Sequence, residues 1–184
     1  MKIVFYRNLL QVRDYLKTPN EKIVYSFLLS KAMFYNDFFD ADGQSLMMDD
    51  VRECLNEYNY LGMYSYSVRR IASELNLSPT TVSSVIEKLK FDNIIKNDEI
   101  YVNFHIIKKG FFSLECPHGI KGELRIFYSF LKDKASQYNG SIDTFKYKLA
   151  EKYNTTETAV TKLLNRLYEL KLAKRLPNGK LEIY

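Results

Sequence analysis

Apolar residues recur at helical spacing in two segments of the chain, and similar polar residues precede both segments. After Ser78-Pro79, four apolar residues fall on one helical face: Val82, Val85, Ile86 and Leu89. After Thr155-Thr156, the corresponding face carries Val160, Leu163, Leu164 and Leu167. Serine and threonine are preferred N-caps and proline suits the first helical position, so a helix is predicted to start at each site.

Further helices and short strands are predicted around these two. Thr18, Pro19 and Glu21 form a capping-box pattern that predicts a helix to about Tyr35. Other helices are predicted over Val68–Leu75, capped by Ser67, from Gly122 to about Tyr138, and from Asp143 or Thr144 to about Tyr153. Strands are predicted at Ser141-Ile142 and in two hairpins, Ile94–Lys96 with Glu99–Val102 and Leu172–Arg175 with Leu181–Tyr184, the second turning at Asn178-Gly179.

The order of these elements repeats because the sequence itself repeats. Ile71–Asn76 aligns without gaps on Leu149–Asn154 at a spacing of 78, and the register continues from Ser78/Thr156 to Lys96/Lys174. Upstream, Tyr25–Leu28 recurs as Tyr128–Leu131, with Lys31 and Lys134 in corresponding places. A repeat of this size predicts a duplicated module.

We therefore predict a mainly α (α+β) protein of two tandem winged helix-turn-helix units with short β-hairpin wings. The first unit would span 1–104, with an N-terminal arm and an acidic insertion at about 36–64 that the second unit lacks. The second would span 105–184, beginning with a connector at Phe104–Lys121 in which Pro117 and Gly119 interrupt regular structure.

Charge is unevenly distributed between these two units. Residues 1–104 contain 12 Lys/Arg and 14 Asp/Glu, a net charge of −2, whereas residues 105–184 contain 15 and 8, a net charge of +7. A basic half favours a polyanionic partner, although a solubilising surface would have the same composition. No apolar run is long enough for a transmembrane helix and the start does not resemble a secretory signal. With two isolated cysteines, Cys54 and Cys116, a reducing cytoplasmic location is expected.

Signals of catalysis are weak, and we predict that the protein is not an enzyme and holds no cofactor or metal. Cys116-Pro117-His118 supplies two of the four ligands that a structural zinc site needs. The acidic stretch at Asp40-Ala41-Asp42-Gly43 lacks the closing glutamate of a calcium loop, so it is interpreted as a solvated loop. There is no glycine-rich phosphate loop.

The candidate chemistry is recognition of double-stranded DNA. In a helix-turn-helix, polar residues at the start of the recognition helix reach base edges and phosphates, and wing residues reach the adjacent backbone. The candidates in the first unit are Ser78, Thr80, Thr81, Ser84 and Lys88. Those in the second are Thr156, Thr158, Thr161, Lys162, Asn165 and Arg166 on the helix, and Lys174, Arg175 and Lys180 on the wing. Each could instead be only a helix cap or a solvated charge.

Two family resemblances point in the same direction. Glu21–Leu29, the Phe39–Gly43 loop and the helix-turn-helix together resemble the N-terminal winged helix of plasmid and phage replication initiators. Ile71–Leu75, with Lys88-Leu89 to Ile94-Ile95, is similar to the winged helix of DnaD-type primosome proteins. These resemblances imply sequence-specific DNA binding by a replication initiator or transcriptional regulator of bacterial or mobile-element origin. The alternative is a winged-helix scaffold in replication or chromosome segregation that binds a protein partner through 36–64.

Overall fold

The computed structural model describes most of the chain as helices and small sheets. It describes residues 3–12, 14–35, 60–62, 67–96, 99–101, 110–115, 117, 119–138, 140–143 and 145–184. Within these ranges the fold is a mixture of six α-helices and short strands, which confirms the α+β class. The chain divides into two compact units, residues 3–111 and residues 112–184. We call them the N-terminal unit and the C-terminal unit; the sequence placed their boundary at 104/105.

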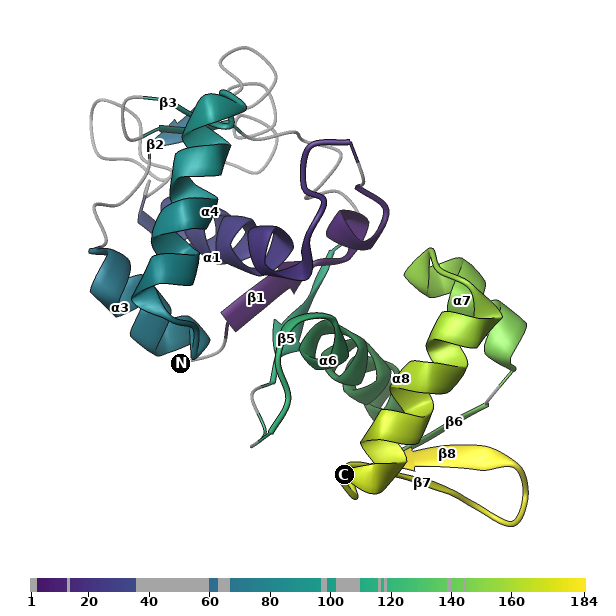
Figure 1. The fold of residues 1–184 in the computed structure, drawn as a ribbon. Helices are drawn as coiled ribbons and strands as arrows, with labels where there is room; N and C mark the ends of the chain where they lie inside the picture. The colour runs from purple at the N-terminus through teal and green to yellow at the C-terminus, as the bar shows by residue number, and fades with distance from the viewer. Residues whose placement is uncertain are drawn as a thin grey trace. The chain divides into compact units, whose positions relative to one another are not determined.

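The N-terminal unit is built around the long helix α1 (Figure 1). Its elements are β1 (Ile3–Tyr6), a 3-10 helix η1 (Arg7–Leu10), α1 (Pro19–Tyr35), β2 (Tyr60–Gly62), α3 (Val68–Leu75), α4 (Pro79–Phe91), β3 (Ile95–Lys96) and β4 (Glu99–Tyr101). The capping box that starts α1 is present, since Thr18 Oγ1 accepts from the Glu21 amide and Glu21 Oε2 accepts from the Thr18 amide, both at 3.3 Å. Helix α1 contacts α3, α4 and the sheet, and contributes the buried side chains of Ile23, Phe27 and Leu28.

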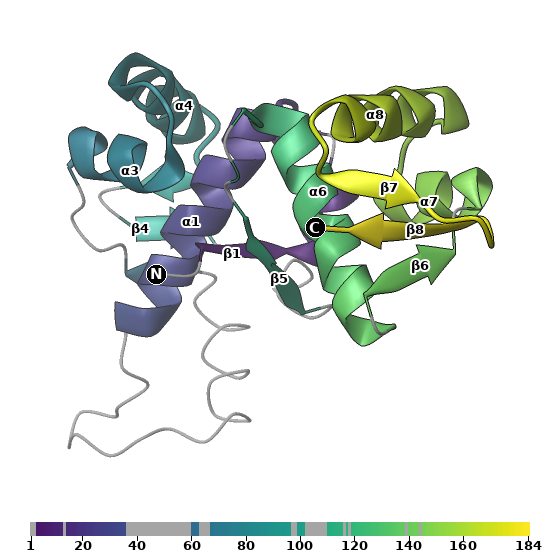
Figure 2. The same cartoon turned by 90° about the horizontal axis from the view of Figure 1, so that it is seen from below.

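The C-terminal unit repeats this order of elements (Figure 2). They are β5 (Phe111–Leu114), α6 (Gly122–Gln137), β6 (Ser141–Asp143), α7 (Lys146–Tyr153), α8 (Glu157–Glu169), β7 (Ala173–Arg175) and β8 (Lys180–Ile183). The three-stranded antiparallel sheets have the same topology, β2-β4-β3 in the first unit and β6-β8-β7 in the second. In both, the strand before the helix pair lies next to the last strand of the hairpin.

The duplication extends to individual backbone angles. Asn76 and Asn154, which end α3 and α7, both adopt the left-handed conformation with φ of 54° and 52°. The next amide in each unit donates 2.9 Å to the carbonyl of Ala72 or Ala150. After α4 and α8, Asn93 and Lys171 are again left-handed, with φ of 56° and 57°. Single left-handed residues close a helix by satisfying its last carbonyls, so equal sequence positions produce equal turns.

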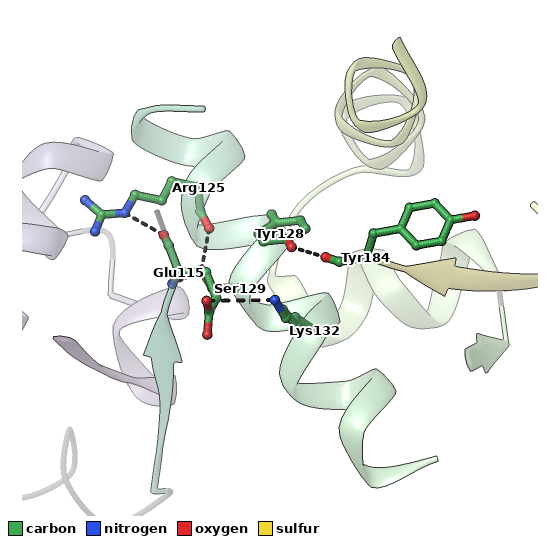
Figure 3. Close-up of polar contacts among 6 residues, drawn as sticks. All are labelled: Glu115, Arg125, Tyr128, Ser129, Lys132 and Tyr184. Atoms are coloured by element: carbon green, nitrogen blue, oxygen red, sulfur yellow. Dashed lines mark hydrogen bonds and ion pairs between the residues drawn. The ribbon is translucent and has the colours of Figure 1, made fainter. Parts of the chain in front are cut away.

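A repeated serine ties the first helix of each unit to the strand before it. Ser26 Oγ accepts from the Tyr6 amide at 3.1 Å and donates to the Val4 carbonyl at 2.9 Å. Its counterpart Ser129 accepts from the Glu115 amide at 2.9 Å and donates to the Arg125 carbonyl at 2.8 Å (Figure 3). Both serines are buried, so these bonds satisfy polar groups that would otherwise destabilise the core.

Further polar contacts hold α6 to the rest of its unit. Arg125 Nε donates to the Glu115 carbonyl at 2.8 Å, and Lys132 lies 3.8 Å from the Glu115 carboxylate (Figure 3). The Tyr128 hydroxyl donates to the carbonyl of Tyr184, which anchors the end of the chain against α6. The ring of Tyr153 on α7 packs edge-on against Phe127 with centroids 5.0 Å apart, so α6 and α7 share an aromatic core.

Several sequence predictions need correction. Helix α7 begins at Lys146 after Phe145, not at Asp143 or Thr144, because Asp143 is used as the last residue of β6. Residues 60–62, placed in the insertion, form β2 and pair with β4. The connector contains β5, and the Asn178-Gly179 hairpin has a three-residue loop closed by Leu176 and Lys180. Ile86 and Leu163, predicted to face the core, are only half-buried.

Other predictions lie outside the described residues. These are the acidic stretch at Asp40-Ala41-Asp42-Gly43, the part of the 36–64 insertion outside 60–62 with its proposed protein contact, and the residues Cys54, Cys116 and His118.

Candidate nucleic-acid interface

Helix α8 and strand β7 together present the most coherent set of candidate residues. A hollow of about 140 Å³ in the C-terminal unit is lined by Thr161, Leu164, Asn165 and Tyr168 from α8, Arg175 from β7 and Lys146 from α7. Three predicted contact residues, Thr161, Asn165 and Arg175, are therefore brought to one place although they come from two elements. The arrangement offers two cations and an amide to an anionic or polar ligand.

The other candidate residues of α8 lie along its exposed face. Thr156 is the N-cap, since its side chain accepts from the Ala159 amide at 3.2 Å, whereas Thr158 and Lys162 are exposed. Thr161 Oγ1 donates to the Glu157 carbonyl at 2.9 Å. Thr156 and Thr161 therefore have local structural roles as well as the predicted ones.

Arg166 is paired with a carboxylate on its own helix. Its guanidinium lies 2.6 Å from Glu169 Oε2, but the side chains are 58% and 61% exposed. Exposed pairs of this kind contribute at most about 1 kcal/mol, so Glu169 does not prevent Arg166 from contacting a phosphate.

The hairpin of β7 and β8 carries three exposed cations. Lys174 and Arg175 lie on β7 and Lys180 starts β8. The loop between the strands is closed by the Leu176 amide, which donates to the Lys180 carbonyl at 2.8 Å. Gly179 has φ of 80°, a conformation that glycine adopts without strain, as expected for a three-residue hairpin loop. The cations are thus mounted on a well-defined hairpin.

Two residues that line this hollow, Lys146 and Tyr168, were not predicted from the sequence. Lys146 was placed inside a helix that in fact begins there, and Tyr168 lies in the last turn of α8, beyond the leading half that was considered. Burial raises the pKa of the Tyr168 hydroxyl, and the charge of Arg175 opposes that change. The hydroxyl is therefore a neutral hydrogen-bonding group at neutral pH.

The corresponding helix of the N-terminal unit, α4, offers much less. Ser78 Oγ accepts from the Thr81 amide at 3.0 Å and lies 2.7 Å from Thr81 Oγ1, so both hydroxyls serve the helix cap. Thr80 and Ser84 are exposed and neutral. Their neutrality leaves Lys88 as the only cation among the five candidates of this unit.

Lys88 is held by a buried carboxylate rather than directed freely into solvent. Its Nζ lies 2.8 Å from Glu21 Oε2, and the Glu21 side chain is only 6% exposed. Burial alone would raise the pKa of Glu21, but hydrogen bonds from Lys88, Lys17 and Thr18 outweigh it and hold that pKa below its ordinary value of 4.5. Glu21 therefore neutralises the candidate cation of α4.

The described ranges contain neither a metal-binding cluster nor a membrane-spanning helix. No three His, Cys, Asp or Glu side chains there lie close enough together to hold a metal ion. None of the helices described combines the length and apolar character required to span a bilayer.

Comparison with known proteins adds no relative. No protein-family model matches the chain, and no curated protein matches it significantly.

Proposed function

We propose that the chain is a tandem winged-helix protein that binds double-stranded DNA in a sequence-specific manner and has no enzymatic activity. In this proposal α4 and α8 are recognition helices and the β3–β4 and β7–β8 hairpins are wings. The observation that carries it is the joint exposure of Asn165 on α8 and Arg175 on β7 around one hollow. An amide suits adenine and a guanidinium suits guanine or phosphate, so helix and wing would engage neighbouring parts of one groove.

The C-terminal unit is proposed to supply most of the affinity. Lys162, Lys174, Arg175 and Lys180 have no carboxylate within ion-pair distance among the described side chains, whereas Lys88 of α4 is paired with Glu21. Free cations release counterions from DNA when they bind phosphates, and a cation that is already paired gains less. The resemblance to plasmid and phage initiators makes replication initiation or transcriptional regulation the proposed biological setting.

A second candidate function, protein recognition, is favoured by one feature of the N-terminal unit. Phe91, the last residue of α4, is 86% exposed, and its counterpart in α8 is the charged Glu169. An exposed phenylalanine at the end of a helix whose candidate cation is already paired suits a protein contact better than a phosphate contact. The scaffold function is therefore kept as the alternative, with α4 as its proposed contact element.

The proposal is tested on duplexes selected by the full-length protein from a random pool. We expect the double variant Lys162→Ala/Arg166→Ala to weaken binding at least tenfold and Thr80→Ala/Ser84→Ala to weaken it less than threefold. Each lost phosphate contact should reduce the slope of log K against log salt by about 0.9, and a lost bidentate base contact should cost about 1–3 kcal/mol. Fluorescence anisotropy at several salt concentrations measures both quantities.

The matched control is Lys121→Ala/Lys132→Ala, which removes two positive charges at α6 of the same unit. It should change affinity less than threefold. Equal losses of affinity from the α4 and α8 double variants would show that both units contribute equally to DNA binding. Selection of no duplex, or no loss from either pair, would contradict DNA recognition and favour the scaffold.

A further inference from the structure

A second pocket in the C-terminal unit shares only Lys180 with the proposed duplex interface. Its volume is about 280 Å³, and it is bounded by the end of α6, by β6, by α7 and by the start of β8. The side chains that matter to the argument are Lys134, Tyr138, Phe145, Lys148, Lys152 and Lys180. Four cations and three aromatic rings, two of them exposed, are an unusual lining for a purely structural depression.

The pocket lacks a carboxylate that is present at the corresponding place in the N-terminal unit. In the N-terminal unit Glu74 lies 3.8 Å from Lys31 and 3.3 Å from Arg70, so it bridges two cations. The corresponding positions, by the repeat spacing, hold Lys134, Lys148 and Lys152. The position of the bridging carboxylate is thus taken by a third cation.

Three of the four lysines of the pocket have no acidic partner among the side chains that the structure describes. These three are Lys148, Lys152 and Lys180, whereas Lys134 has partners, with Gln137 Oε1 at 3.4 Å from its Nζ among them. Lys148 and Lys152 are four residues apart on α7, where like charges repel. An anion bound in the pocket would relieve the repulsion.

Two aromatic side chains of the pocket are exposed to solvent, which is unfavourable for large apolar rings. Tyr138 is 63% exposed and Phe145 is 52% exposed, and Lys148 Nζ lies 4.9 Å from the centroid of the Phe145 ring. Phe145 is also the N-cap of α7 and makes no capping hydrogen bond, while its counterpart Ser67 caps α3 through the Arg70 amide. A residue that breaks a local rule in only one of two copies is expected at a functional site.

We propose that this pocket binds one nucleotide unit, with its phosphate among Lys134, Lys148 and Lys152 and its base stacked on Phe145 or Tyr138. Bases stack on exposed aromatic rings and phosphates bind lysine, and the volume is near the lower end of the roughly 300–1,000 Å³ of ligand pockets. The unit can come from a free nucleoside phosphate or from a single strand. The inference goes beyond duplex recognition by α8 and does not depend on it.

The test titrates the full-length chain with dAMP, deoxyadenosine, inorganic phosphate and an eight-nucleotide single strand, followed by calorimetry and amide NMR. We expect dAMP to bind at least about fivefold more tightly than phosphate or the nucleoside, because stacking and charge act together. A single strand that binds at least tenfold more tightly than dAMP identifies a strand as the source. Equal or tighter binding of dAMP identifies a free nucleotide.

Two variants separate loss of the site from loss of the fold. Lys152→Glu recreates the bridging carboxylate of the N-terminal unit and should weaken dAMP binding at least tenfold. Phe145→Ser recreates the cap formed by Ser67 and should weaken it at least about fivefold without lowering the melting temperature. The control Lys162→Glu makes the same charge change on α8 and should leave dAMP binding within twofold.

Three results would contradict the proposal that this pocket binds a nucleotide. They are no binding of dAMP or the strand, dAMP binding no tighter than that of phosphate, and full dAMP binding by Lys152→Glu. If duplex binding is found together with any of these, the proposed function stands and only the pocket fails. Binding of dAMP that responds to these variants, in a chain that selects no duplex, would leave the pocket standing and remove the duplex proposal.

Discussion

At the scale of single residues, the pair formed by Glu21 and Lys88 determines the character of the N-terminal unit. Glu21 is 5% exposed and receives hydrogen bonds from the Lys17 amide at 2.7 Å and the Thr18 amide at 3.3 Å, besides its contact with Lys88. These bonds compensate the carboxylate for its burial. One side chain therefore starts α1, fixes α4 against it and removes a positive charge from the α4 surface.

The lowered pKa of Glu21 predicts a pH-dependent contribution to stability. A carboxyl group whose pKa is lower in the folded protein stabilises the fold above its unfolded pKa, and this stabilisation is lost as pH falls through the folded pKa. Glu21→Gln should reduce the free energy of unfolding at pH 7 by about 1–3 kcal/mol, and the difference from wild type should shrink below about pH 4. Urea unfolding at pH 7 and pH 3 measures this.

Glu123→Gln is the matched control, since Glu123 is the exposed acidic residue in the first turn of α6. It should change stability by less than about 0.5 kcal/mol at either pH. An equal effect of both substitutions, or a Glu21→Gln difference that grows at low pH, would contradict the assignment.

At the scale of elements, left-handed residues decide where α4 and α8 end and their hairpins begin. Lys171 follows α8 in the left-handed conformation, and its amide donates 3.0 Å to the Tyr168 carbonyl. The following Leu172 amide donates 2.9 Å to the Leu167 carbonyl. Non-glycine residues are strained in this conformation, so a lysine at position 171 lowers the stability of the protein.

Replacing that lysine with glycine should therefore stabilise the protein. Lys171→Gly is expected to raise the free energy of unfolding by about 0.5–1 kcal/mol, because relief of left-handed strain exceeds the entropy that glycine adds to the unfolded chain. Lys162→Gly makes the same change inside α8 and should lower it by about 1 kcal/mol. Thermal unfolding followed by circular dichroism compares the two variants. Changes of the same sign in their free energies of unfolding would refute the argument.

At the scale of the whole molecule, charge is concentrated where the candidate contacts are. Residues 112–184 contain 13 Lys/Arg and 8 Asp/Glu, a net charge of +5, which equals the charge of the entire chain. The N-terminal unit carries its candidate cation in an ion pair, so the unit with the lower net charge also offers no unpaired candidate cation. Association with a polyanion should thus depend on salt mainly through one unit.

The duplex proposal predicts the size of that salt dependence. If Lys162, Arg166, Lys174, Arg175 and Lys180 each contact a phosphate, each should contribute about −0.9 to the slope of log K against log salt, or about −4.5 in all. Anisotropy titrations of the full-length chain between low and moderate salt provide the slope. A value shallower than about −2 would show that most of these cations do not contact phosphate.

Local sequence determined the helices and the two hairpins. Thr18 and Glu21, Ser67, Ser78 and Thr156 form caps with partners three residues away, so helix starts could be predicted from a few neighbouring residues. Apolar periodicity identified the buried faces of α4 and α8, and the repeat identified two units with one order of elements. The start of α7 was wrong because Phe145 caps it without a hydrogen bond, which no capping pattern can indicate.

Only the tertiary structure decided which charged side chains are paired inside the fold and which remain available to a ligand. Glu21 and Lys88 are far apart in the sequence, so their pairing follows from the packing of α4 on α1 and leaves no local signal. The same holds for β2, whose three residues form a strand because β4 lies beside them. The two hollows of the C-terminal unit likewise combine side chains from three or four elements each. Caps and periodicity act over one or two helical turns, whereas partners and pockets depend on contacts between segments that only the folded chain brings together.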